Sequence, residues 1–200
     1  MKLSDLVVIT SNIGKIEEIN AILGTDHKVS TIEVPEIQSL NLDEVITAKA
    51  KAAYEKIKKP VLVTDVSLEI EGFGGLPGPF VKFFLKTLGA EKTVKLVKGS
   101  RRTKVTDAVA IYDGKIFKIF KGTIWGKVIP KARGTSGFGF DFVFVPDGYT
   151  KTWAQMPSSV KNKISHRAMA LKKLKDYLTS QKLRNVSPAV LNLVLHLIQN

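Results

Sequence analysis

The N-terminal part of the chain alternates between apolar runs and segments of helical periodicity. The runs at residues 6–10, 28–34 and 61–70 predict strands, because each is rich in Val, Ile or Leu and is bounded by polar or turn residues. Between them, residues 16–23 place apolar side chains at helical spacing. A second helix is expected at 43–58, where Asp43 and Glu44 suit the N-terminal end of the dipole and Pro60 follows the last turn. This β-α-β-α-β order is typical of a layered α/β fold, in which helices pack on a sheet.

The middle of the chain predicts a helix followed by a hairpin. A helical pattern covers residues 80–97, after the Gly- and Pro-rich loop 72–79. Residues 104–112 and 115–125 predict two strands, and Asp113-Gly114 between them is a strong hairpin signal. Further strands are expected near residues 127–130 and 140–145, and helices at 165–178 and 187–198.

Together these segments predict an α/β fold with an elongated central mixed β-sheet flanked by helices and two lobes around a cleft. The length of 200 residues fits a single domain over 1–200. Residues 183–200 are expected to extend this domain as an extra C-terminal helical tail, since their apolar side chains recur at helical spacing.

The composition indicates a globular chain with a large positive charge. Hydrophobic residues make up 44% and charged residues 24%, so the chain can bury a core. The absence of cysteine excludes a disulfide framework and fits a cytoplasmic protein, and no apolar run is long enough for a signal peptide or a membrane span. The net charge of +13 attracts polyanions, but it does not choose between nucleic acid, acidic membrane and phosphorylated small molecules.

The segment TSNIGK, residues 10–15, follows the first strand and opens the first helix. Free backbone N–H groups and the positive end of the helix dipole can bind phosphate at such a junction, and Lys15 adds a charge. The alternative is ordinary N-capping by Ser11 or Asn12 with an incidental lysine. The segment alone leaves both interpretations open.

Two carboxylates are predicted near the ends of neighbouring strands. Asp65 lies inside the apolar run VLVTDVSL, where a charged side chain requires a partner or a metal ion. Glu36 follows Pro35 near the end of another predicted strand. A pair of this kind could bind Mg²⁺ together with substrate phosphate and water. The alternative for Asp65 is a turn at the end of its strand.

Basic residues begin the helix at 165–178. Ser165 is placed to cap it, so His166 and Arg167 fall in the first turn, where positive charge opposes the helix dipole. An anion bound there would remove this cost, which favours a functional role.

The stretch RGTSGFGFDFVFVPDG, residues 133–148, joins a Gly-rich loop to an apolar run. Phe138 and Phe140 are either core residues or platforms on which a flat base stacks. Asp141 either caps a turn or accepts hydrogen bonds from a ligand.

Four motifs occur in order and at suitable distances over residues 6–178: TSNIGK, VLVTDVSLEI…GGLPGPFVKFFL, GFGFDFVFVPDG and AQMPSSVKNKISHRAMAL. In this combination the chain resembles the inosine/xanthosine triphosphate pyrophosphatases, which hydrolyse deaminated purine nucleoside triphosphates. The resemblance implies a two-lobed fold with a nucleotide-binding cleft, a homodimer, and Mg²⁺-dependent cleavage between the α- and β-phosphates of ITP, dITP or XTP. The products would be the nucleoside monophosphate and pyrophosphate.

The same resemblance assigns roles by motif. The phosphates would be bound by Thr10, Ser11, Asn12, Ile13, Gly14 and Lys15, with further substrate contacts from Lys49, Lys82 and Lys161. Glu36 and Asp65 would hold magnesium, and Asp65 would also accept the proton of water as the catalytic residue. The base and sugar pocket would comprise Phe138, Gly139, Phe140 and Asp141, with His166 and Arg167 closing on the base.

Three positions depart from the family pattern. Thr64 stands where a second acid commonly precedes the catalytic Asp, and Val66 stands where Ser or Thr commonly follows it. Gln155 replaces the glutamate of the usual AEM sequence, so a carboxylate is lost there. These departures predict a metal site that is either weaker or more dependent on substrate oxygens.

A nucleic-acid-binding basic module is the alternative of another class, motivated by the net charge and the aromatic loop. It explains neither the apolar setting of Asp65 nor the Pro35-Glu36 turn, and the lysines form no basic stripe. We therefore expect neither a nucleic acid nor a membrane as a partner.

Overall fold

The computed structural model describes residues 1–184. Its strands are β1 (Val7–Ile9), β2 (Lys28–Ser30), β3 (Val61–Ile70), β4 (Pro77–Gly78), β5 (Arg102–Tyr112), β6 (Phe117–Val128) and β7 (Phe144–Pro146). Its α-helices are α1 (Ile13–Leu23), α2 (Leu42–Ile57), α3 (Val81–Lys95), α4 (Ser158–Ile164) and α5 (His166–Arg184), with short 3₁₀ turns at Leu3–Asp5, Glu71–Phe73 and Trp153–Gln155. In this part of the chain, no helix is both long and apolar enough to cross a membrane.

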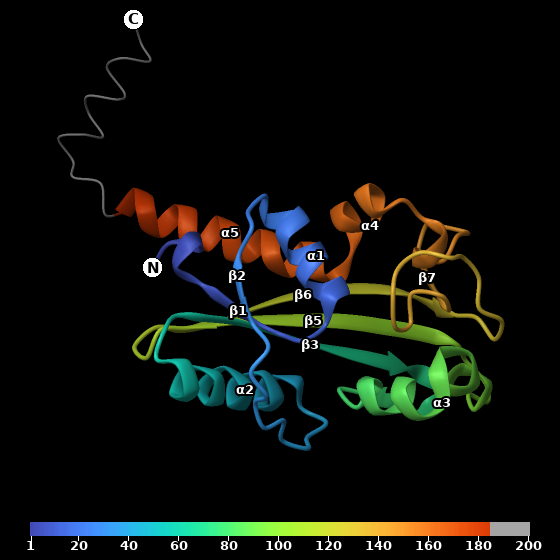
Figure 1. The fold of residues 1–200 in the computed structure, drawn as a ribbon. Helices are drawn as coiled ribbons and strands as arrows, with labels where there is room; N and C mark the ends of the chain where they lie inside the picture. Colours follow the sequence, from blue (N-terminus) through green and yellow to red (C-terminus); the bar gives the residue numbers. More distant parts are fainter. Residues whose placement is uncertain (185–200) are drawn as a thin grey trace, which may run out of the picture.

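The described strands form one seven-stranded mixed sheet. Its order is β2-β1-β3-β5-β6-β7, and β4 pairs with β3 off this path. β1 runs parallel to both β2 and β3, whereas the pairs β3–β5, β5–β6 and β6–β7 are antiparallel. The long strands β3, β5 and β6 form the spine of the molecule (Figure 1). The predicted elongated mixed sheet flanked by helices is confirmed.

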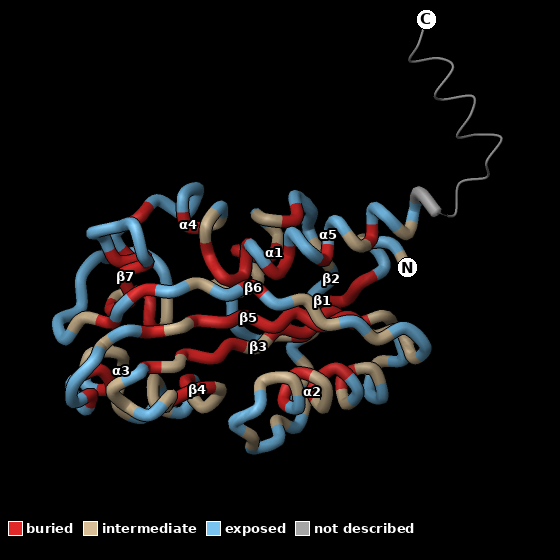
Figure 2. The backbone as a smooth tube through the Cα atoms, turned by 180° about the vertical axis from the view of Figure 1, so that it is seen from behind, coloured by how far each residue is buried: buried red, intermediate tan, exposed pale blue. Residues whose placement is uncertain are grey.

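Helices cover both faces of this sheet. α1 and α5 lie on one face, and α2 and α3 lie on the other (Figures 1 and 2). Along β3, alternate residues point to opposite faces: Leu62 packs in the core under α1 and α5, and Val61 and Val63 pack under α2. A third core lies at the far ends of the long strands, around Phe144 and Trp153.

The helix α2 shows how the sequence begins and ends such an element. The Asn41 side chain accepts a hydrogen bond from the Asp43 backbone N–H at 3.0 Å, which caps the N-terminus. Lys58 ends the helix in a left-handed conformation. The buried stripe of the helix includes Lys49 among apolar residues, so this lysine points toward the sheet.

Three predicted strands need correction, and one helix was not foreseen. The strand expected at 28–34 ends at Ser30. Residues 127–130 form no separate strand, because β6 continues to Val128. The strand expected at 140–145 begins only at Phe144, since the chain turns through residues 138–143 with hydrogen bonds of turn type. The helix α4 precedes α5 and was not foreseen, whereas the capping of α5 by Ser165 is confirmed: its Oγ accepts from the Ala168 backbone N–H at 3.2 Å. The helix expected at 187–198, with most of the 183–200 tail, lies outside the described residues.

A glycine in β6 brings the start of α5 onto the sheet. Gly122 is buried, and a Cβ atom there would meet the backbone of α5, including the carbonyl oxygen of His166 and, at 2.6 Å, the amide nitrogen of Ala170. Only glycine permits this approach, because both obstructing atoms belong to the backbone and cannot rotate away. The height of His166 and Arg167 above the sheet therefore depends on the absence of a side chain at position 122.

We predict that Gly122→Ala lowers the free energy of unfolding by about 1–3 kcal/mol, the usual cost of overpacking a buried contact. The melting temperature measured by calorimetry should fall by several degrees. Lys118→Ala, at an exposed position of the same strand, is the matched control and should leave the melting temperature nearly unchanged. An unchanged melting temperature in Gly122→Ala would contradict the packing described.

Candidate active site

A cleft of about 740 Å³ opens beside β3, between the two helical layers. Its volume lies in the range of small-molecule sites. Fifteen of the residues predicted from the sequence line it: Thr10, Ser11, Asn12, Lys15, Glu36, Lys49, Asp65, Lys82, Phe138, Gly139, Phe140, Asp141, Lys161, His166 and Arg167. Ile13 and Gly14 do not line it, and the Ile13 side chain is exposed to solvent. The segment Thr31–Val34 also lines the cleft and was not foreseen.

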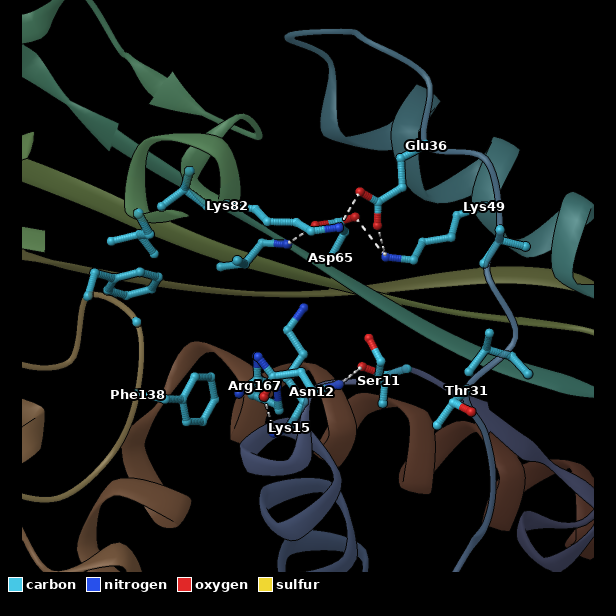
Figure 3. Close-up of a pocket in the computed structure, with 18 of the residues that line it drawn as sticks. Ser11, Asn12, Lys15, Thr31, Glu36, Lys49, Asp65, Lys82, Phe138 and Arg167 are labelled. Carbon is cyan, nitrogen blue, oxygen red and sulfur yellow. Dashed lines mark hydrogen bonds and ion pairs between the residues drawn. The ribbon is translucent and has the colours of Figure 1, made fainter. Parts of the chain in front are cut away.

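The two sides of the cleft carry different chemistry. Glu36, Lys49, Asp65 and Lys82 lie on the side of α2 and α3 (Figure 3). Lys15, Phe138 and Arg167 face them from the side of α1 and α5. A ligand in the cleft would therefore contact carboxylates and lysines on one side, and an aromatic ring with basic groups on the other.

Glu36 and Asp65 converge on one cation. The Lys49 ammonium lies 3.0 Å from Glu36 Oε1 and 3.1 Å from Asp65 Oδ2. Lys82 reaches the other Glu36 oxygen at 2.9 Å. Desolvation would raise the pKa of Glu36, but the two lysines outweigh it and lower the pKa to about 2. Both carboxylates are thus held close to a single cationic group.

The donor set for a metal ion is small. Within residues 1–184, no group of three or more His, Cys, Asp or Glu side chains is arranged to hold a metal. Two carboxylates that share one ammonium do suit a hard divalent cation completed by water and phosphate oxygens. Gln155 is exposed and binds the backbone N–H of Thr152 at 3.1 Å, and it does not line the cleft. The replacement of the usual glutamate by Gln155 therefore does not alter the Glu36–Asp65 pair.

The first turn of α1 shows capping and a candidate phosphate site together. Asn12 caps the helix by accepting from the Lys15 backbone N–H at 3.0 Å. The Lys15 ammonium has no ion pair within residues 1–184, and it lies between the two sides of the cleft (Figure 3). Its desolvation, reinforced by the charges of Lys49 and Arg167 and opposed by Asp65 and Asp107, lowers the pKa of Lys15 to about 8.

Asp141 holds the aromatic loop in place. Its Oδ2 accepts from the Phe138 backbone N–H at 2.9 Å and forms an ion pair with the Lys161 ammonium. Burial raises the pKa of Asp141, and Lys161 opposes that shift. The Lys161 ammonium also lies 4.9 Å from the centre of the Phe138 ring. The Asp141 carboxylate is thus already engaged by the protein. A hydrogen bond between Asp141 and a ligand stays a prediction.

The two phenylalanines of the loop differ in setting. Phe138 is half-buried and packs on the first turn of α1, where a Cβ atom on Gly14 would lie 2.6 Å from the Phe138 Cε1. Phe140 is only 7% exposed and packs against Phe144, Trp153 and His166. Phe140 is thus a core residue at the edge of the cleft, and stacking on a base stays a proposal for Phe138 alone.

His166 and Arg167 are both buried at the start of α5. His166 stacks on Trp153 at 5.0 Å, and neither of its ring nitrogens has a hydrogen-bond partner among the described residues. Desolvation, with the charges of Arg167, Lys161 and Lys15, lowers the pKa of His166 well below its usual value, so the ring is neutral. A neutral imidazole offers one donor and one acceptor to a ligand.

Two buried acids complete the site and were missed in the sequence. Glu18 on α1 forms ion pairs with Lys161, at 2.7 Å, and with Arg167. Asp107 on β5 faces Arg167 at 3.0 Å. A signal for Asp107 was present, because it interrupts the apolar run VTDAVAIY just as Asp65 interrupts VLVTDVSL. Glu18 lies three residues after Lys15, and so on the same side of α1.

Together, the fold and the cleft define a layered α/β protein with a cationic small-molecule site beside its central strand. Residues 6–177 match the Ham1 family, and the chain belongs to that family. It is 40% identical over 186 residues to an inosine triphosphate pyrophosphatase of Yarrowia lipolytica, covering 88% of this chain and 96% of the relative. It is 37% identical over 174 residues to a dITP/XTP pyrophosphatase of Hyperthermus butylicus, covering 84% and 92%. The Staphylococcus aureus Ham1 protein structure superposes with a TM-score of 0.68 at 27% identity, covering 88% and 98%.

We predict that the Lys15 ammonium loses its proton with a midpoint near pH 8, against about 10.4 for an unperturbed lysine. The pKa is lowered, so the charge is present below this pH and is lost above it. A ¹³C NMR titration of the lysine Cε signals measures the midpoint, and Lys15→Met identifies the signal by removing it. A midpoint at or above pH 10 would contradict the desolvated position of this lysine.

Proposed function

We propose that this chain hydrolyses deaminated purine nucleoside triphosphates, namely ITP, dITP and XTP, to the nucleoside monophosphate and pyrophosphate. The observation that supports this most is the convergence, in one cleft, of the Glu36–Asp65 pair, the start of α1 and the buried basic residues of α5. The names of the relatives, inosine triphosphate pyrophosphatase and dITP/XTP pyrophosphatase, point to the same reaction.

The triphosphate is bound by the start of α1 and the lysines around it. The backbone N–H groups of the first helical turn and the positive end of the helix dipole attract anions. Lys15, Lys49 and Lys82 line the cleft and supply positive charge that matches the phosphate chain. Below a pH of about 8, Lys15 retains the charge needed for this contact.

Glu36 and Asp65 are the residues that would hold Mg²⁺. Their oxygens already share the Lys49 ammonium, so a cation between them is electrostatically favourable. When bound, magnesium neutralises phosphate charge and makes a coordinated water more acidic.

Asp65 accepts the proton of the attacking water. Its Oδ1 accepts from the Val66 backbone N–H at 2.9 Å and its Oδ2 from Lys49, so both oxygens are fixed in orientation. As the proton moves to the carboxylate, the water oxygen forms a bond to phosphorus. The bridging P–O bond between the α- and β-phosphates breaks, and its electron pair leaves with pyrophosphate.

The purine base is recognised across the cleft from the Glu36–Asp65 pair, on the side of Phe138 and Arg167 (Figure 3). Inosine and xanthosine carry an oxygen at purine C6, and Arg167 can only donate hydrogen bonds. This donor satisfies the C6 oxygen but faces a second donor in the 6-amino group of adenine. The ring of Phe138 lies beside it, as do the nitrogens of His166, which have no hydrogen-bond partner within residues 1–184. A site built in this way disfavours ATP, because buried groups would be left unpaired.

The family resemblance adds two further expectations for this enzyme. We expect it to be a homodimer and to act in the cytoplasm, where such nucleotides would form. Neither expectation enters the chemistry proposed for the cleft.

We predict that hydrolysis of ITP requires Mg²⁺ and yields pyrophosphate. ³¹P NMR of the reaction mixture identifies the products, and the reaction is run with and without EDTA, followed by restored Mg²⁺. EDTA should stop the reaction and added Mg²⁺ should restart it. Turnover in EDTA, or orthophosphate formed without pyrophosphate, would overturn the proposed function.

We predict that Asp65→Asn lowers kcat for ITP by about a hundredfold or more while the fold is retained. The amide preserves shape but loses the proton acceptor, and general-base catalysis contributes on this order. Asp26→Asn, at an exposed position on the loop after α1, is the matched control and should retain full activity.

Glu36→Gln distinguishes metal binding from general-base catalysis by Asp65. It should mainly raise the Mg²⁺ concentration needed for half-maximal rate, since Asp65 remains to accept the proton. Near-normal kcat in a folded Asp65→Asn protein would remove Asp65 from the mechanism.

A further inference from the structure

Asp107 is a fully buried carboxylate in the middle of an apolar strand. It lies on β5 with none of its surface exposed, paired in register with Val66 of β3. Its neighbours Val109 and Ile111 pack under α1 and α5, so its side chain points to that face of the sheet. An ionised carboxylate in such a place is costly unless it is hydrogen-bonded and paired.

Asp107 meets both requirements with two partners. The Thr64 hydroxyl donates a hydrogen bond to Oδ1. Oδ2 lies 3.0 Å from Nε of Arg167, at ion-pair distance but without the alignment of a full hydrogen bond. The Asp107 carboxylate is therefore held through Oδ1 by Thr64 of β3, and its Oδ2 faces the Arg167 guanidinium.

Arg167 is held at two of its three nitrogens. Nη1 donates to Glu18, and Nε faces Asp107. Within residues 1–184, Nη2 has neither a hydrogen bond nor an ion pair, and the residue lines the cleft. Since the guanidinium is planar and rigid, fixing Nε and Nη1 also fixes the direction of the Nη2 donors.

Strand β3 connects this arrangement with the chemistry. Successive residues of a strand point to opposite faces, so Asp65 faces the carboxylate–lysine side and Thr64 faces α5. Neighbouring residues of one strand thus serve the two sides of the cleft. The orientation of Arg167 depends on the strand that also presents Asp65.

We propose that Asp107, with its carboxylate oriented by the Thr64 hydroxyl, is a positioning residue that aims Arg167 at the purine C6 oxygen and so determines base specificity. This inference rests on the proposed function. It assigns roles to two residues that touch neither the phosphates nor the reacting water. Their loss should therefore alter discrimination between bases more than the rate of bond cleavage.

Thr64→Val is the most direct test, because it removes the hydroxyl and keeps the shape of the side chain. The ratio of kcat/KM for ITP to that for ATP should fall about 3- to 10-fold, the range that corresponds to one net hydrogen bond. The change should come mainly from a higher KM for ITP. Thr64→Ser, which restores the hydroxyl, should recover most of the ratio. Asp107→Asn should lower the ratio further, because the charge facing Nε is lost.

Thr106→Val is the matched control on β5. The Thr106 hydroxyl bonds to that of Thr123 at 3.0 Å, and position 106 points away from the face on which Asp107 lies. This variant should lower the melting temperature about as much as Thr64→Val does, but it should leave the ITP-to-ATP ratio unchanged. A merely structural role for Thr64 predicts the same ratio in both variants.

The outcomes separate the inference from the proposed function. A wild-type ratio in folded Thr64→Val and Asp107→Asn proteins would overturn the positioning role alone. Should Asp107→Asn fail to fold, Thr64→Val decides, since it leaves the ion pair in place. A wild-type protein that cleaves ITP and ATP equally well, or neither, would overturn the proposed function and this inference with it.

Discussion

The site depends on a buried cluster of opposite charges at the meeting point of five segments. Glu18 from α1, Asp107 from β5 and Asp141 from the aromatic loop bind Lys161 of α4 and Arg167 of α5. Breaking a buried pair by removing one partner usually costs about 3–5 kcal/mol, because the other charge is left uncompensated. These ion pairs therefore fix α1, α4, α5 and the loop relative to the sheet. The geometry of the base side of the cleft therefore depends on these ion pairs.

Neighbouring residues of the long strand β3 face the two sides of the cleft, one for phosphate chemistry and one for recognition of the base. Asp65 points to the side of Glu36 and Lys49, where carboxylates and ammonium groups suit a metal ion and phosphates. Thr64 points to the buried charge cluster, where the ligand would meet aromatic and basic groups. Lys15 lies between the two sides, and its lowered pKa reflects the desolvation that this central position brings. One strand thus aligns the phosphate chemistry with recognition of the base.

Local patterns predicted much of this molecule. The run 61–70 became β3 with the predicted bounds, because it is rich in Val and Leu and follows Pro60, which ends the preceding helix. The aromatic run was misjudged, since the loop before it continues as turns and only Phe144–Pro146 pairs with β6. Glu18 was missed because its partners lie far along the chain: Arg167 is 149 positions away. No local pattern encodes such a contact, so the cleft lining was predictable from motifs while Glu18 was not. Asp107 did leave a local signal, because it interrupts an apolar run.

In the proposed binding mode, the phosphates lie between the first turn of α1 and the Glu36–Asp65 pair, and the base lies against Arg167 in the same cleft. The most direct measurement is a crystal structure with Mg²⁺ and a non-hydrolysable ITP analogue bearing an imido group between the α- and β-phosphates. We expect the phosphate chain between the first turn of α1 and the Glu36–Asp65 pair, with the C6 oxygen at hydrogen-bond distance from Arg167. A nucleotide bound in the reverse direction, or outside this cleft, would contradict it.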